Sequence, residues 1–219
     1  ATLAHELRNP LAPIRNGVEL LRMGGRPDAA GRVLDMMDRQ VRHLVHLVDD
    51  LLDVSRVTTG KIVLRPERLD LREVVDAAVE TSRPALDAGR HALAVELPAG
   101  PLPVDGDRTR LVQVMTNLLT NAAKYTPAGG WVTVSAEADG GYAVARVTDT
   151  GVGIPADMLA QVFDVFTQVG RTLDRAQGGL GLGLAVVRKL VELHGGAVWG
   201  ESPGPNRGCT FVVRLPLAP

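Results

Sequence analysis

The chain has 219 residues, of which 45% are hydrophobic, and this is enough apolar sequence for the core of one large domain or two ordinary ones. Its 24 Lys and Arg residues nearly balance its 25 Asp and Glu residues, so the net field is too small to hold nucleic acid or an anionic membrane surface. Cys209 is the only cysteine, which excludes an internal disulfide and fits a reducing compartment. We interpret it as a small buried residue of a strand.

The chain begins in the middle of an apolar helical pattern, without a capping residue. No uninterrupted apolar run approaches the ~20 residues that span a bilayer. We therefore expect a cytoplasmic fragment of a longer protein, whose input domain and any membrane attachment lie outside it.

Two amphipathic segments at the start of the chain predict a helical hairpin. Apolar residues recur in steps of four and three from Leu3 to Leu21, and again from Val33 to Leu51, which is the spacing of a helix packed in a bundle. A break at residues 24–28, with two glycines and a proline, separates them. A lone hairpin leaves each apolar seam half covered, so we expect a homodimer through residues 1–60 that completes a four-helix bundle.

The rest of the chain predicts a second domain at 71–219, after a connector at 61–70. Its expected elements are a helix at 71–88, a strand at 93–97, a helix at 107–124 capped by Asp107, strands at 131–136 and 143–149, a helix at 183–194, and strands at 197–199 and 210–215. This order favours an α+β fold, a two-layer sandwich in which helices cover one face of a mixed sheet.

His5 is the first candidate for chemistry, because it lies off the apolar seam of its helix. A step of two from Leu3 turns a side chain by about 200° around a helix, so His5 is expected to face solvent. An ordinary surface histidine is the alternative. Against that alternative, Glu6 is adjacent, Asn9 lies one turn further along the same face, and Pro10 removes an amide beside them, which favours a bend.

Three further groups of residues are candidates for binding a ligand. Asn117, Asn121 and Lys124 share one face of the 107–124 helix, which is either an ordinary solvated face or a site for Mg²⁺ and phosphate oxygens. Residues 149–155 (DTGVGIP) end a strand with glycines that form a turn or let a ligand approach the backbone. Residues 178–184 (GGLGLGL) open a helix, where free amides attract anions, and match neither a dinucleotide fingerprint nor a Gly-Lys-Ser/Thr phosphate loop.

Together these segments resemble the sensor histidine kinases, over essentially the whole chain and in that family's order. Residues 5–11 (HELRNPL) are similar to the family's H-box, 117–126 to its N-box, 149–155 to its G1-box, Phe163 and Phe166 to its F-box, and 178–184 to its G2-box. In one departure, Leu180 stands where many members carry Thr or Ser, and this leaves a side-chain contact with phosphate open.

The resemblance implies a dimeric hairpin and an ATP-binding domain of a type shared with topoisomerase subunits, mismatch-repair proteins and a heat-shock chaperone. By resemblance, Asn121 holds Mg²⁺, Lys124 meets phosphate and Tyr125 packs beside the adenine. Asp149 accepts a hydrogen bond from the adenine amino group. The full set of residues implied to bind ATP is Asn117, Asn121, Lys124, Tyr125, Asp149, Gly151, Gly153, Ile154, Phe166, Gly179, Leu180, Gly181, Leu182 and Gly183.

The implied reaction is transfer of the γ-phosphoryl group of ATP to His5, with Glu6 handling the proton of the ring. The phosphoryl group would pass to an aspartate of a response-regulator receiver domain, and Asn9 is implicated in removing it again from that partner. Two other functions stay open: a plain ATPase that drives conformational change, and a silent dimeric scaffold. The hairpin with His5 argues against the first, and the intact set of His5, Asn121 and Asp149 argues against the second.

Overall fold

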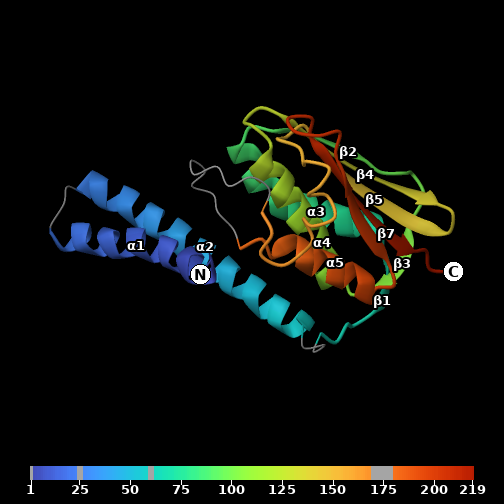
Figure 1. Ribbon diagram of the computed structural model, residues 1–219, viewed down its shortest axis with the longest axis horizontal. Helices are drawn as coiled ribbons and strands as arrows, with labels where there is room; N and C mark the ends of the chain where they lie inside the picture. The colour runs from blue at the N-terminus through green and yellow to red at the C-terminus, as the bar shows by residue number, and fades with distance from the viewer. Residues whose placement is uncertain (1, 24–26, 59–61, 169–179) are drawn as a thin grey trace.

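The computed structural model describes residues 2–23, 27–58, 62–168 and 180–219, and for part of the hairpin, including residues 2–7, it describes the backbone alone. Two antiparallel helices, α1 (Thr2–Arg22) and α2 (Pro27–Thr58), form the predicted hairpin beside a second domain (Figure 1). The second helix begins six residues before the first apolar position of its predicted seam, Val33. None of the described helices is long and apolar enough to cross a membrane.

The hairpin helices approach each other closely at Gly17 of α1. A β-carbon built at Gly17 would lie 2.7 Å from Sδ of Met37 and 3.2 Å from Cγ1 of Val33, so a larger residue would require the Met37 side chain to move. One side of α2 carries an apolar stripe that the described residues leave exposed. Its members are between 41% and 54% exposed and follow one another in steps of seven, four, three and four: Leu34, Val41, Val45, Val48 and Leu52.

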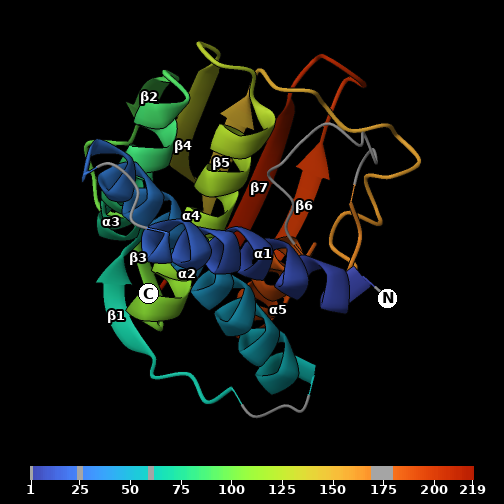
Figure 2. The same ribbon diagram turned by 90° about the vertical axis from the view of Figure 1, so that its left-hand side faces the viewer.

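The second domain is an α+β fold with a mixed sheet, as predicted. Its main sheet has five strands in the order β2-β4-β5-β7-β6, in which only β2 and β4 are parallel. Three helices cover one face of this sheet (Figures 1 and 2). In chain order the elements are α3 (Leu71–Ala88), β2 (Ala92–Glu96), α4 (Arg108–Tyr125), β4 (Trp131–Asp139), β5 (Tyr142–Asp149), α5 (Gly183–Leu193), β6 (Ala197–Glu201) and β7 (Cys209–Pro216).

The core lies between the helical layer and the sheet, and it is built from aliphatic side chains that alternate along the strands. Val132, Val134 and Ala136 of β4 are all buried, with their neighbours along the strand more exposed. Val75 of α3 and Leu119 of α4 contribute fully buried side chains from the other layer. The amphipathic pattern read from the sequence therefore places the helices correctly.

Two short strands were not predicted. Strand β1 (Glu67–Asp70) pairs antiparallel with β3 (Pro103–Gly106) in a separate two-stranded sheet. The residues of β1 fall within the predicted connector, while the domain division at residues 60 and 71 stays a prediction. Each strand has four residues, too few for a clear alternation of apolar and polar side chains.

Two aspartates start the helices that follow these strands. Asp107 caps α4 as predicted, because its carboxylate accepts a hydrogen bond from the amide of Arg110 at 3.2 Å. Asp70 caps α3 through the amide of Arg72 and also accepts from the amide of Leu102, at 3.0 and 3.1 Å. The side-chain hydrogen bond from Arg72 lowers the pKa of Asp70 to about 2.

Candidate functional site

The carboxylate of Asp149 lies at the end of strand β5, buried to 5% exposure. Its Oδ1 atom accepts a hydrogen bond from the amide of Gly151 at 2.7 Å, and its Oδ2 atom accepts one from Sγ of Cys209 at 2.8 Å. Cys209 is a buried strand residue, as predicted, but it is also a hydrogen-bond donor, which the sequence interpretation missed. Burial first, and then the negative charge of Asp149, raise the pKa of the Cys209 thiol.

The glycine-containing loop after β5 is held against the end of α4. A β-carbon at Gly151 would lie 2.5 Å from the carbonyl oxygen of Tyr125, and the amide of Val152 donates to that same oxygen at 3.1 Å. The predicted N-box and G1-box are therefore brought together, with Tyr125 36% exposed at their junction.

Residues 204–208 support this loop from its other side. Gly153 has φ +66°, and a β-carbon there would lie 2.1 Å from the carbonyl oxygen of Gly204. The amide of Ile154, whose side chain is 7% exposed, donates to Oγ of Ser202 at 3.0 Å. Gly153 and Ile154 are therefore held through their backbone contacts, and Ser202 is a supporting residue that sequence motifs did not reveal.

The polar face of α4 meets the start of α5. A β-carbon at Gly183 would lie 3.9 Å from Cγ of Asn117, and Nδ2 of Asn117 is buried without a hydrogen-bond partner. An unpartnered buried amide fits a site that takes a polar ligand. Asn121 and Lys124, further along this face, are partly exposed, and the Lys124 ammonium lies 4.9 Å from the centre of the Tyr125 ring.

The start of α5 leaves its backbone amides without a side-chain cap. Leu182 occupies the capping position and makes no side-chain hydrogen bond. Gly181, with φ +66°, accepts a hydrogen bond from the amide of Phe166 at 3.1 Å, and a β-carbon on it would lie 2.5 Å from the carbonyl oxygen of Thr167. Uncapped amides at a helix start suit a phosphate group. Gly179 lies outside the described residues.

The two phenylalanines of the predicted F-box have different environments. Phe163 is 4% exposed and packs edge-on against Phe211 with ring centres 5.9 Å apart. Phe166 is 47% exposed and has φ +64°, an unusual backbone conformation for a bulky residue. Phe163 is thus a core residue, and Phe166 is the aromatic side chain that lies open beside the glycine-rich segment.

Leu180 and Leu182 turn their side chains to the hairpin. They are 2% and 1% exposed and form an apolar cluster with Leu47 of α2, which is 3% exposed, and with the partly buried Leu51. The C-terminal half of α2 lies beside α5 in both views (Figures 1 and 2). This packing gives leucine at position 180 a physical role.

The residues predicted to act on the hairpin lie in α1. His5 and Glu6 belong to this helix, although their side chains lie outside the described part of the structure. Asn9 is exposed, and Pro10, one residue further, is buried. The helix continues through Pro10 and Pro13 to Arg22.

His194 links α4 and α5, although sequence reasoning assigned no role to this histidine. Its Nδ1 atom pairs with the carbonyl of Leu190 at 2.7 Å, and its Nε2 atom accepts from the amide of Asp107 at 3.0 Å. The end of α5 is thereby joined to the start of α4. A lone histidine in a sequence carries no signal for such a contact.

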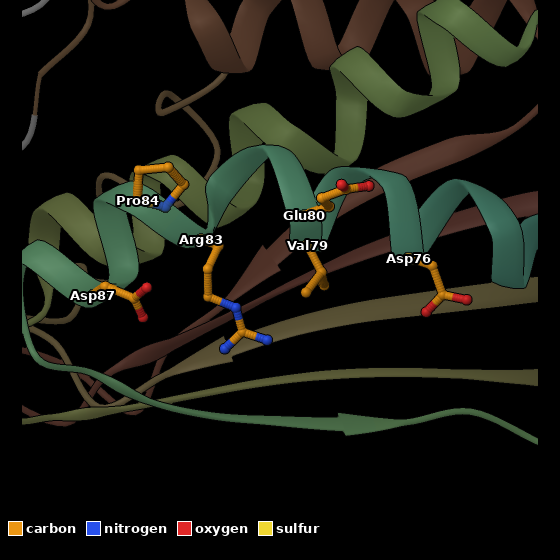
Figure 3. Close-up of a pocket in the computed structure, with 6 residues that line it drawn as sticks. All are labelled: Asp76, Val79, Glu80, Arg83, Pro84 and Asp87. Atoms are coloured by element: carbon orange, nitrogen blue, oxygen red, sulfur yellow. The ribbon is translucent and has the colours of Figure 1, made fainter.

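A separate groove runs along α3, away from these groups (Figure 3). It is lined by residues of that one helix: Asp76, Val79, Glu80, Arg83, Pro84 and Asp87. None of the predicted site residues lines it, so it contributes nothing to the candidate site.

The combined groups fit a nucleotide with a hard cation. Asp149 offers an acceptor for an amino group of a base, the start of α5 offers amides for phosphate, and Asn121 offers an amide oxygen for Mg²⁺. Within the described ranges no three His, Cys, Asp or Glu side chains gather as a metal site.

Comparisons with known proteins identify the domain families of the two parts of the chain. Residues 1–60 match the His Kinase A (phospho-acceptor) domain, and residues 106–219 match the histidine kinase-, DNA gyrase B- and HSP90-like ATPase family. The sensor histidine kinase RcsC of Escherichia coli (strain K12) is 36% identical over 99% of this chain, and the chain covers 23% of RcsC.

Two solved structures extend the comparison. The Acinetobacter baumannii histidine kinase AdeS has a TM-score of 0.76 at 27% identity, and the match covers 98% of both chains. The histidine kinase ThkA, solved in complex with the response regulator protein TrrA, has a TM-score of 0.73 at 25% identity over 98% of this chain and 60% of that one. The chain belongs to the histidine kinase family, as a phospho-acceptor hairpin joined to an ATPase domain of the histidine kinase, DNA gyrase B and HSP90 type.

Proposed function

We propose that the chain transfers the γ-phosphoryl group of ATP to His5, on its own hairpin or on that of a second copy. One observation carries the proposal. A buried carboxylate, Asp149, the amide face of α4 and the uncapped start of α5 gather in one domain, and that domain is joined to a helix bearing His5. An ATP pocket alone would fit many proteins, whereas the phospho-acceptor hairpin supplies the nucleophile.

Different residues bind the base and the phosphates of the nucleotide. Asp149 accepts a hydrogen bond from the adenine amino group, and Tyr125 packs beside the base. Lys124 and the amides of Gly181 and Gly183 meet the phosphates. Asn121 would hold a Mg²⁺, which would offset the charge of the triphosphate.

The chemical step is an in-line displacement at the γ-phosphorus. The lone pair on Nε2 of His5 forms the new N–P bond while the bond from the γ-phosphorus to the bridging oxygen breaks and ADP leaves. Glu6 accepts the proton from Nδ1, so the ring does not carry a positive charge against the phosphorus. Such general-base assistance is typically worth ~10²–10⁴-fold in rate.

The apolar stripe on α2 supports a homodimer. Five exposed aliphatic side chains, from Leu34 to Leu52, follow the spacing of a coiled-coil seam, and a second hairpin would cover them. The phosphoryl group then passes to an aspartate of a response-regulator receiver domain, a partner of the kind with which ThkA was solved. Asn9, which is exposed and lies one turn beyond His5, would orient a water that removes the phosphoryl group from that partner.

A plain ATPase and a silent scaffold are the alternatives, and one experiment separates all three. The pure chain is incubated with γ-labelled ATP and Mg²⁺, and the protein is then tested for label. A kinase gives acid-labile, base-stable label on the wild type and none on His5→Gln, since a phosphoramidate has that stability. Released phosphate without protein label would identify an ATPase, and the absence of both would identify a scaffold.

A further inference from the structure

His91 lies in the turn between α3 and β2, and its ring reaches the last turn of α4. The imidazole is 8% exposed, and its Nε2 atom lies 3.0 Å from the carbonyl oxygen of Ala123. A carbonyl oxygen can only accept a hydrogen bond, so Nε2 carries the hydrogen of the neutral ring and donates it. Nδ1 is buried without a hydrogen-bond partner among the described residues. The ring is thus placed for one polar contact, the one with α4.

This contact satisfies a carbonyl that the helix itself leaves free. Ala123 belongs to the last turn of α4, where carbonyl groups run out of helical partners. The amide of Thr126 still donates to the carbonyl of Ala122 at 3.0 Å, but the next residue, Pro127, has no amide hydrogen for the carbonyl of Ala123. The hydrogen bond is partly buried, where an unpaired carbonyl costs free energy. His91 therefore supplies the donor that Pro127 lacks.

The turn that carries His91 is shaped around its ring. Arg90 has φ +54°, a conformation that favours glycine, and the amide of His91 donates to the carbonyl of Leu86 at 3.0 Å. The glycine of this turn lies one residue earlier, at Gly89, where a β-carbon would lie only 2.1 Å from Nε2 of His91. The chain therefore accepts backbone strain at Arg90 and leaves space at Gly89, and both features direct the ring to α4.

Two candidate nucleotide-binding residues lie in this same last turn of α4. Lys124 and Tyr125 follow Ala123 directly, and the Lys124 ammonium lies 4.9 Å from the centre of the Tyr125 ring. On the other side of the turn, the carbonyl of Tyr125 is held by the amide of Val152 at 3.1 Å. The turn is thus held from two sides, one of which is the ring of His91.

We propose that His91 is a positioning residue for nucleotide binding, because its ring N–H fixes the turn that presents Lys124 to phosphate and Tyr125 to the base. It acts through the backbone of Ala123 and not as a ligand of the nucleotide. This inference rests on the proposed function, in which Lys124 and Tyr125 bind ATP.

The physical reason lies in what happens to the last turn when the donor is removed. The carbonyl of Ala123 is then unpaired, and it gains a hydrogen bond only if the turn opens toward water. Opening of the turn moves Lys124 and Tyr125 together, since they follow Ala123 in the chain. Loss of the His91 donor should therefore weaken nucleotide binding, although neither binding residue has changed.

The test compares His91→Gln with His91→Met, because these side chains are similar in length and only glutamine carries an N–H donor. ADP affinity is measured by calorimetry, and hydrogen exchange is followed at the amides of Leu111 and Thr126, near the start and at the end of α4. Gly89→Ala is a second test, since it keeps the imidazole but fills the space beside Nε2. Gly100→Ala is its control, because a β-carbon there meets nothing within 4 Å. Melting curves of all four variants confirm folding.

We expect His91→Met to bind ADP about fivefold more weakly than His91→Gln, the size of one net hydrogen bond. Exchange of the Thr126 amide should be faster in His91→Met while that of Leu111 is unchanged, because only the last turn is released. Gly89→Ala should weaken ADP binding in the same way, and Gly100→Ala should not.

Equal ADP affinities in His91→Gln and His91→Met, or faster exchange along the whole of α4 in His91→Met, would overturn the positioning role. If Lys124→Ala is still impaired in that case, the proposed function stands. If His91→Met does not fold, equal ADP affinities in Gly89→Ala and Gly100→Ala would overturn the role instead. Unchanged ADP affinity in both Lys124→Ala and Tyr125→Ala would remove the last turn from the nucleotide site and contradict the proposed function as well.

Discussion

The surroundings of Asp149 in the ATP domain and the hairpin differ in where their supporting contacts come from. Around Asp149, backbone amides, a thiol and close glycine contacts hold the functional group from within the same domain. The hairpin leaves an apolar stripe on α2 exposed, and its buried Leu47 is covered by residues of the other domain. The difference indicates that the position of Asp149 is set within one domain, whereas the hairpin depends on what packs against it.

The largest effect is expected on the hairpin itself, from Glu6→Gln. The amide cannot accept the Nδ1 proton, so the rate of autophosphorylation should fall by ~10²–10⁴-fold with ADP affinity unchanged. Asn9→Ala serves as the matched variant on the same face and should keep autophosphorylation while losing phosphatase activity toward the phosphorylated partner. If both activities fall together in Asn9→Ala, the residue has a structural role beside Pro10.

Asp149→Asn tests the other region. An acceptor becomes a partial donor facing the adenine amino group, and a lost hydrogen bond to a charged group typically costs about 1.5–3 kcal/mol of binding free energy. Calorimetric titration should show this loss, while light scattering shows an unchanged oligomeric state, because the hairpin makes no use of Asp149. A change of oligomeric state would show that the two regions are less independent than their contacts indicate.

Leu47→Ala tests the place where the two regions meet. Removal of this buried side chain should destabilise the start of α5 by about 2 kcal/mol, the lower end for a buried leucine, and speed hydrogen exchange of the amides from Leu182 to Val186. Leu52→Ala, on the exposed stripe, should leave that exchange unchanged and weaken the dimer instead. Equal exchange in both variants would contradict an intrachain role for Leu47.

The smallest effect is expected at Asp70, which caps α3 in the ATP domain. Asp70→Ala should lower the free energy of unfolding by about 1–2 kcal/mol at neutral pH, while Asp70→Asn, which keeps a capping group, should lose less. The pKa of Asp70 is lowered to about 2 by Arg72, so its contribution is present above pH 4 and is lost as the pH falls toward 2. Urea titrations of the wild type and both variants at pH 7 and pH 3 measure these free energies of unfolding. A difference between Asp70→Ala and the wild type that does not shrink at pH 3 would exclude the ion pair as its source.

Separate fragments test directly which region forms the dimer and which region binds ATP. Residues 71–219 alone should be monomeric and still bind ATP, and residues 1–60 alone should form the dimer, since the exposed stripe lies entirely in α2. Light scattering gives the mass of each fragment. A dimeric 71–219 fragment would move the interface into the ATP domain.

The sequence allowed the long elements and the nucleotide motifs to be predicted, because their signals are local. The apolar periodicity of α3 and α4, the cap at Asp107 and the glycines at 151 and 181 are each visible within a few residues. The donor role of Cys209 could not be predicted in this way, because it depends on the pairing of β5 with β7, 60 positions apart. The four-residue strands β1 and β3 and the packing of Leu180 on Leu47 are likewise products of long-range contacts.

The central claim is that the Asp149 pocket and His5 belong to one enzyme. It is tested most directly by mapping phosphate on peptides after the full chain is incubated with ATP and Mg²⁺. We predict phosphate on the peptide that contains His5, and a large reduction of it in Asp149→Asn at the same ATP concentration. Phosphate on a different residue, or undiminished phosphate on His5 in Asp149→Asn, would contradict the account.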